Sequence, residues 1–186
     1  MTDEDPLQEA LKAVAVALKE ADVPFALAAG YAAWARGGPE PDHDVDFVVR
    51  ADAVDAARKA LESADLRVEQ PPEDWLFKVF QGEAMVDVIH TITGTPVDGA
   101  LLGRAEVLEV LSVQMPVLST TDVIAGKLLA MDEHYCDFAT VLPVVRAVRE
   151  QVDRPLLEEL TSASPFARAF LRLADDLGIL RTAPTR

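Results

Sequence analysis

Apolar residues recur at helical spacing in the first twenty positions of the chain. Between residues 7 and 21 the apolar positions are three or four residues apart, with charged residues between them: Leu7, Leu11, Val14 and Leu18. Side chains at this spacing share one face of a helix. The pattern therefore predicts an amphipathic helix, and residues 52–63 predict a second one in the same way.

Two apolar runs that follow the first helix are typical of buried strands. Residues 24–28 form the first run, which Gly30 interrupts. Residues 31–36 have the composition of a short helix that a Gly-Gly-Pro sequence at 37–39 ends. A polar loop then leads to the second run, residues 44–50, which predicts a strand.

A β-hairpin is predicted between residues 75 and 90. Gly82 and Glu83 can form a two-residue turn with glycine first, as a type II′ turn prefers. This turn pairs Lys78 with Asp87 and places apolar residues on the opposite face of the two strands. Residues 106–118 predict another hairpin.

Helices are expected from residue 119 onward. Ser119 begins a capping-box sequence in which Asp122 stands in for the usual Glu, so a helix should run from there to about Met131. A second helical stretch, residues 137–151, contains Pro143, which should kink or split it.

The last predicted helix is bounded by three local signals, and it completes the order of elements. Ser164 is its expected N-cap, Pro165 its first residue and Gly178 its stop. The whole pattern predicts an α/β fold: a small mixed β-sheet with flanking helices over residues 1–120, followed by a C-terminal helical domain over residues 121–186.

The composition is that of a globular protein. Half of the 186 residues are apolar, and no apolar run approaches the roughly 20 residues that a membrane span needs. The acidic N-terminus has no apolar segment of the kind a signal peptide carries. The single cysteine, Cys136, cannot form an internal disulfide. We therefore expect a cytoplasmic protein without a membrane partner.

The net charge of −15 lies mostly in the first two thirds of the chain. Residues 1–120 carry 22 acids and 9 bases, whereas residues 121–186 carry 10 acids and 8 bases. A negative field repels nucleic acid. An RNA partner would therefore have to dock on the C-terminal part, whose arginines include Arg146, Arg149, Arg154, Arg168 and Arg172. Their spacing forms no continuous stripe, so they can equally be solvated surface residues.

Three carboxylates carry the candidate chemistry. Asp44 and Asp46 are two residues apart at the head of an apolar run, so in a strand they would point the same way. Such a pair raises its own pKa values unless a cation lies between the carboxylates. Asp87 lies inside a later apolar run. The pair predicts a divalent-cation site, most commonly Mg²⁺, at Asp44 and Asp46, and the arrangement with Asp87 suggests phosphoryl chemistry. The structural alternatives are a solvated strand start and a cross-strand ion pair between Lys78 and Asp87.

Other metal and nucleotide motifs fail on spacing. An EF-hand that began at Asp42 would have Phe47 where glycine is needed and Ala53 where glutamate is needed. The histidines and the cysteine lack zinc-finger spacing. There is no GxxxxGK[ST] and no GxSxG sequence.

The remaining pattern resembles the nucleotidyltransferase superfamily that includes DNA polymerase β. Gly30-Tyr31, then Asp44-Val45-Asp46, then Asp87 on a later strand are similar to its hG[GS], Dh[DE] and third-acid signature. The stretch from Ala29 to Gly37 looks like the minimal bacterial branch, with AbiEii/MenT-type toxins and small antibiotic adenylyltransferases. Lys127 followed by Asp137 is similar to the helical motif of that group. The resemblance covers about residues 23–140.

The resemblance implies a role for each matched residue. Asp44, Asp46 and Asp87 would hold Mg²⁺, and Asp87 would also accept the proton of the acceptor hydroxyl. Backbone amides at Gly30 and Tyr31 would cradle the phosphates of an NTP. Two roles remain: Lys127 would contact a phosphate, and Asp137 would orient Lys127.

The acceptor and the activity remain open at this stage. The toxin branch implies transfer of an NMP to the tRNA 3′ end and a cognate antitoxin, whereas the negative charge favours a cationic small molecule such as an aminoglycoside. A third hypothesis is an inactive interaction module. It rests on Tyr31, which occupies a position that is small in the family, and on the acids Glu40 and Asp42, where many relatives carry Arg and Thr.

Overall fold

The computed structural model describes residues 5–41 and 44–180. Seven strands form one mixed sheet in the order β3-β4-β5-β2-β1-β9-β8. Their bounds are β1 Phe25–Ala28, β2 Val45–Val49, β3 Arg67–Glu69, β4 Leu76–Gln81, β5 Ala84–Ile89, β8 Glu106–Val110 and β9 Val113–Val117. A separate two-stranded ribbon consists of β6 Thr91–Ile92 and β7 Thr95–Pro96. The α/β fold with a mixed sheet is therefore confirmed.

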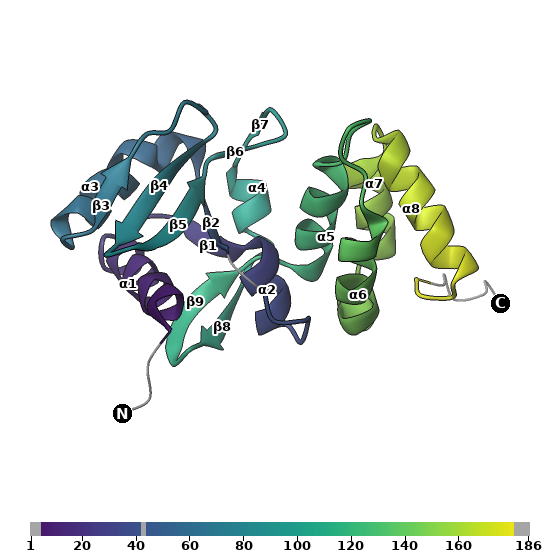
Figure 1. Cartoon of the computed structure of the whole chain (residues 1–186), viewed down its shortest axis with the longest axis horizontal. Coiled ribbons are helices and arrows are strands. Elements are labelled where there is room, and N and C mark those ends of the chain that lie inside the picture. Colours follow the sequence, from purple (N-terminus) through teal and green to yellow (C-terminus); the bar gives the residue numbers. More distant parts are fainter. Residues whose placement is uncertain (1–4, 42–43, 181–186) are drawn as a thin grey trace.

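Helices accompany the sheet and continue beyond it: α1 and α3 lie with the strands on the left, α2 and α4 lie nearer to α5, and α5 to α8 lie on the right (Figure 1). The sheet region holds α1 Pro6–Glu20, α2 Ala29–Ala35, α3 Val54–Ser63 and the short α4 Gly99–Leu102. The C-terminal region holds α5 Thr120–Leu129, α6 Phe138–Val148, α7 Arg154–Thr161 and α8 Pro165–Asp176. Two 3₁₀ turns, Ala51–Ala53 and Arg149–Gln151, precede α3 and follow α6. None of the helices in the described part of the chain has the length and apolar character of a membrane span.

The two faces of the sheet differ in chemistry because strand side chains alternate. On β2, Phe47 and Val49 point to one face, and the parallel pairing of β2 with β5 aligns Val88 with Phe47. All three are fully buried, on the side that α1 covers. Asp46 and Val48 point to the other face. The predicted hairpin is confirmed, including the pairing of Lys78 with Asp87.

Helix α5 belongs to two hydrophobic cores. Its residue Val123 packs with the core of the sheet, whereas Ile124 and Leu128 pack with α6, α7 and α8. The expected capping box is present in part, because the Ser119 hydroxyl accepts a hydrogen bond from the Asp122 amide at 3.1 Å. The predicted boundary at residue 120 thus falls at the N-terminus of a helix that both cores share, and it stays a prediction.

Several elements differ from the sequence-based expectation, among them β3, α4 and the β6–β7 ribbon, which were not predicted. The strand predicted from residue 44 begins at Val45, so Asp44 precedes it. Helix α7 was not expected, although Asp153 caps it by accepting a hydrogen bond from the Leu156 amide at 3.1 Å. The expected split near Pro143 takes a milder form, since α6 contains this proline and then passes into the 3₁₀ turn.

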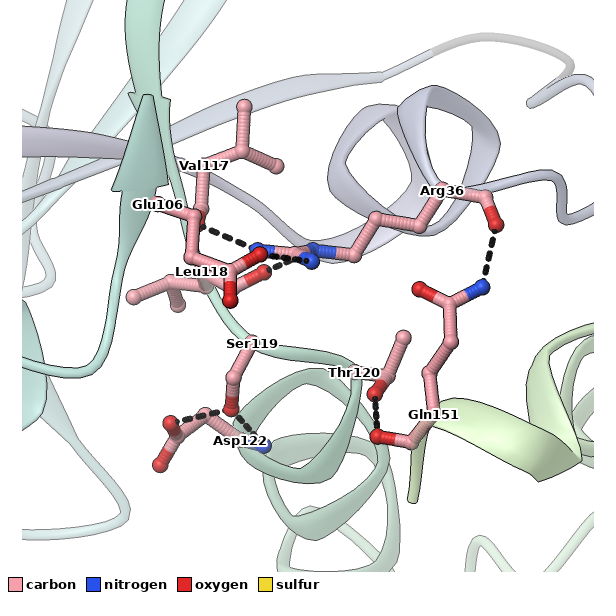
Figure 2. A network of polar contacts seen from close by, with 8 residues as sticks. All are labelled: Arg36, Glu106, Val117, Leu118, Ser119, Thr120, Asp122 and Gln151. Carbon is pink, nitrogen blue, oxygen red and sulfur yellow. Dashed lines mark hydrogen bonds and ion pairs between the residues drawn. The ribbon is translucent and has the colours of Figure 1, made fainter. Parts of the chain in front are cut away.

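Arg36 ties the sheet region to the start of α5 (Figure 2). Its side chain is only 7 % exposed. Its Nε donates to the Leu118 carbonyl at 2.7 Å and its Nη2 to the Val117 carbonyl at 3.0 Å, while Nη1 pairs with Glu106. Gln151 extends the network, because its side-chain amide donates to the Arg36 carbonyl at 2.8 Å. This network fixes where α5 starts relative to the sheet.

We predict that Arg36→Met destabilises the protein by about 2–4 kcal/mol, because two buried carbonyls lose charged donors. The matched control is Arg149→Met, whose guanidinium is half exposed and donates to Arg146 and Glu150; it should cost less than about 0.5 kcal/mol. Urea unfolding followed by circular dichroism measures both. Equal losses in the two variants would contradict the role of Arg36.

Candidate active site

A row of paired side chains crosses five strands on the face of the sheet opposite α1. The register pairs successive members of the row as Glu69, Lys78, Asp87, Asp46 and Ala28. Paired residues in neighbouring strands point to the same face. The row therefore brings two of the predicted carboxylates, Asp46 and Asp87, side by side from separate strands.

Lys78 neutralises one of these carboxylates. Its Nζ lies 3.0 Å from Oδ1 of Asp87, and both side chains are about a quarter exposed. The cross-strand ion pair that the sequence offered as a structural alternative is thus present. It leaves Asp46 as the member of the pair without an ion-pair partner among the described residues.

The environment of Asp46 is unfavourable to a negative charge. Burial raises the pKa of this carboxyl to about 6, and the nearby charges of Asp87 and Asp44 add to the effect. Lys127 and Lys78 act in the opposite direction without cancelling it. This group of side chains therefore carries surplus negative charge centred on Asp46.

Asp44 lies close enough for its charge to act on Asp46. It is exposed and precedes β2, so strand alternation does not fix its direction as the sequence pattern assumed. Over residues 5–41 and 44–180, no three His, Cys, Asp or Glu side chains are gathered closely enough to hold one ion as they stand. Asp46 and Asp87 thus form the fixed part of the group. Asp42, predicted to disfavour a nucleotide, lies outside the described residues.

Gly30 and Tyr31 lie in the first turn of α2, two and three residues after Ala28, the strand partner of Asp46. A Cβ atom at Gly30 would lie 2.9 Å from Cβ of Pro41, so only glycine allows the loop before β2 to pack here. The Tyr31 side chain is buried and packs edge-on against Trp34, with ring centroids 5.8 Å apart. The large ring of Tyr31 is therefore accommodated in the core. The family resemblance, in which a small residue occupies this position, did not predict this placement.

The turn from β1 into α2 is strained. Ala29 has a φ angle of +46°, in the left-handed region that residues with a Cβ atom seldom occupy. Such a conformation costs on the order of 1 kcal/mol and persists only where the surroundings impose it. It occurs one residue after the partner of Asp46, where α2 begins.

The two residues predicted on the helical side have different surroundings. Lys127 lies on α5, and its charge acts on Asp46. Asp137 instead caps α6, since its Oδ1 accepts a hydrogen bond from the Ala139 amide at 2.9 Å. In the described part of the chain no hydrogen bond or ion pair joins it to Lys127. The structure thus brings Lys127, but not Asp137, to the carboxylates.

Sequence reasoning missed a cavity of about 560 Å³ that adjoins the carboxylates. Its walls include Lys127, Trp75 and Ala28, which come from α5, the start of the first hairpin and the end of β1. It also missed the bidentate pair that buries Asp122 against Arg104, with Oδ1 2.6 Å from Nη2. The signals for both were weak, because no local pattern joins residues so far apart.

Comparison with known proteins gives a fold. No family model matches the chain, and no curated protein matches its sequence. Among solved structures, the antibiotic-resistance factor ANT(2'')-Ia in complex with adenylyl-2''-tobramycin is 15% identical, with a TM-score of 0.62 over 88% of this chain and 98% of that chain.

Two further solved structures share this fold. An antigenic nucleotidyltransferase-like protein from Paracoccidioides brasiliensis is 15% identical, with a TM-score of 0.60 over 95% of this chain and 93% of that chain. The lincosamide antibiotic adenylyltransferase LnuA with lincomycin bound is 12% identical, with a TM-score of 0.53 over 77% and 97%. This chain therefore has the fold of the nucleotidyltransferases.

Proposed function

We propose that this protein is a Mg²⁺-dependent nucleotidyltransferase that moves an NMP from an NTP to a hydroxyl group. The observation that carries the proposal is the pairing of Asp46 with Asp87 on adjacent strands, with surplus negative charge around Asp46. An uncompensated acidic group of this kind on a nucleotidyltransferase fold supports a site for a divalent cation and the phosphates it accompanies.

The residues present fit such a cation. The donors are carboxylate oxygens, which Mg²⁺ prefers, and no histidine or cysteine is among the groups that shift the pKa of Asp46. Asp44, Asp46 and Asp87 would hold the ion. When bound, the ion supplies charge neutralisation at the phosphate oxygens. Asp87 can turn to it from Lys78, because a partly exposed ion pair costs little to open.

The chain's own residues complete the reaction. The acceptor oxygen attacks the α-phosphorus, the bond from that phosphorus to the bridging oxygen breaks, and pyrophosphate leaves. The proton of the acceptor hydroxyl goes to Asp87. Lys127 places a positive charge on a phosphate, and the backbone amides of Gly30 and Tyr31 support the others. Asp137 enters this proposal only as the cap of α6.

A small molecule is the acceptor that we favour. Of the five C-terminal arginines considered for RNA binding, four have partners within the protein. Arg154 pairs with Asp175 and Glu158, and Arg172 with Asp176. Arg149 and Arg168 donate to neighbouring carbonyls. Together with the net charge of −15, these internal partners weigh against a phosphate backbone as the acceptor.

The tRNA 3′ end and a cognate antitoxin rest on the sequence resemblance alone. A small open reading frame next to the coding sequence would favour them. The inactive-module hypothesis loses part of its basis, because the Tyr31 side chain is turned into the core. One assay distinguishes the three hypotheses: a small-molecule acceptor, a tRNA acceptor and an inactive module.

The assay offers purified protein, each labelled NTP and Mg²⁺ to an aminoglycoside panel, a lincosamide panel and total tRNA. We predict label on a small molecule, and a rate reduced at least ~100-fold in Asp46→Asn and in Asp44→Asn. The matched control is Asp55→Asn, an exposed acid on α3, which should stay within about twofold of wild type. Label on tRNA would support the toxin. No transfer, with no binding of any Mg-NTP by calorimetry, would refute the enzyme.

A second prediction concerns stability and pH in the absence of Mg²⁺. The pKa of Asp46 rises from 3.8 to about 6 on folding, so folding favours its protonated form. The contribution of protonated Asp46 to the free energy of unfolding is fully present below about pH 4 and is lost as the pH rises through 6. Asp46→Asn removes the charge, so at about pH 8 it should raise the free energy of unfolding by up to about 3 kcal/mol.

Urea unfolding at several pH values tests this. The gain from Asp46→Asn should shrink to well under 1 kcal/mol near pH 4. Millimolar Mg²⁺ at pH 8 should stabilise the wild type more than the variant, because the ion binds the ionised group. If Asp46→Asn were less stable than wild type at pH 8, the ionised Asp46 carboxylate would not be destabilising the folded protein.

A further inference from the structure

The cavity beside the carboxylates has three walls. Val48 and Ile89 on the sheet form its floor, a face of α5 forms the second wall, and Trp75 with the β6–β7 ribbon forms the third. Figure 1 shows the elements that carry these residues: the sheet lies on the left, α5 on the right, and the β6–β7 ribbon at the top between them. A volume of about 560 Å³ lies in the range of sites that enclose a whole small molecule.

The walls are mostly apolar. Three charged residues reach them, and one of these, Asp122, is already bound by Arg104 and by the Ser119 hydroxyl. Asp74 and Lys127 remain. A triphosphate carries several negative charges and needs several donors or cations, which these walls do not offer. The cavity therefore suits a different part of the reaction mixture from the phosphates.

One face of α5 is shaped to leave the cavity open. Val123, Gly126, Lys127 and Ala130 line it at helical spacing. Glycine in the middle of a helix costs about 0.5–1 kcal/mol relative to alanine. A Cβ atom at Gly126 would meet no other atom within 4 Å, so close packing does not explain this glycine. Because Gly126 has no side chain, the space in front of this part of α5 stays open.

Trp75 supplies an exposed aromatic surface at the same place. The residue is 42 % exposed although it lines the cavity. Its backbone is fixed, because the Trp75 carbonyl accepts hydrogen bonds from the amides of His90 and Thr91 at 3.0 and 3.2 Å. An exposed indole on a fixed backbone is a good surface for an apolar or planar ring.

The cavity and the carboxylates share one face of the sheet. Val48 follows Asp46 by two residues on β2, and Ile89 follows Asp87 by two residues on β5. Two residues along a strand span about 7 Å. Lys127 links the two places, since it lines the cavity and its charge acts on Asp46. A molecule on this floor can therefore extend a hydroxyl to the carboxylates.

We propose that the cavity binds the body of the acceptor, and that this acceptor is an alcohol with an apolar ring or chain and few charges. The proposal rests on the proposed function and names the substrate class of that site. The alcohol oxygen forms the new bond to the α-phosphorus, its proton goes to Asp87, and pyrophosphate carries away the electrons of the broken bond. A polycation or an RNA end finds too few polar partners on these walls.

The main rival occupant is the nucleobase of the NTP. A base presents donors and acceptors along its edges, and a site that selects one must match them. Apart from the charged residues, the polar groups that side chains bring to the walls are the hydroxyls of Thr91 and Thr93 and the indole N–H of Trp75. The cavity thus fits an apolar body better than a base. A variant that fills the cavity separates the two.

Gly126→Leu should fill the cavity without a clash, because the space around a Cβ atom is open there. The control is Gly99→Leu on α4, where a Cβ atom also meets nothing within 4 Å and the residue lies outside the cavity. The probe is 2-naphthylmethanol, titrated by saturation-transfer NMR. Affinity for whichever of Mg-ATP, Mg-CTP, Mg-GTP and Mg-UTP binds is measured by calorimetry. Thermal unfolding checks that both variants are folded.

We expect the wild type to bind the alcohol and the Mg-NTP together. Gly126→Leu should weaken the alcohol at least tenfold and change the Mg-NTP affinity less than twofold, while Gly99→Leu changes neither. Gly126→Ala should give an intermediate loss.

Three results would overturn the acceptor proposal. Two of them leave the proposed function standing: a wild type that binds Mg-NTP but not the alcohol, or a loss of Mg-NTP binding in Gly126→Leu with the alcohol retained, which would assign the cavity to the base. In the third, no Mg-NTP binds at all. The proposed function then fails with the acceptor proposal, and any binding of the alcohol reports only an apolar cavity.

Discussion

The parallel pairing of β2 with β5 is the constraint on which the site depends. This register sets Asp46 against Asp87, and the next pair on the same face, Val48 and Ile89, becomes the floor of the cavity. A shift of one residue would turn the carboxylates into the core that α1 covers, where charges are far more costly. The fully buried Phe47 and Val88 prevent that shift, because they would have to leave the core. The apolar face thus holds the acidic face in register.

The second constraint lies at the start of α5. Arg36 reaches the carbonyls at the end of β9, and Gln151 ties the 3₁₀ turn after α6 to the carbonyl of Arg36 (Figure 2). These bonds position α5, which contributes Lys127 beside Asp46 and one wall of the cavity. The helical region is thereby part of the candidate site, and the two hydrophobic cores meet on the helix that lines the cavity.

Local signals predicted much of this architecture. The turn at Gly82 predicted the pairing of Lys78 with Asp87 because hairpin register follows from turn geometry. Ser119, Ser164 and Pro165 predicted helix starts for the same local reason. The side-by-side placement of Asp46 and Asp87 was expected from the family resemblance. It could not be derived from the chain itself, since nothing local specifies which strands become neighbours.

What could not be predicted depends on tertiary packing. The direction of Asp44 is not fixed by a strand, and the bulk of Tyr31 disappears into the core. Arg36 bonds to the main-chain oxygens of Val117 and Leu118, and only its third contact, Glu106, is a side chain. Any amino acid can offer a carbonyl. The contacts with Arg36 therefore do not restrict which amino acids occupy positions 117 and 118. A substitution there needs no compensating substitution elsewhere to keep these hydrogen bonds. A contact made through main-chain oxygens therefore constrains the sequence weakly. It is one way in which proteins can keep a common fold after their sequences have diverged beyond recognition.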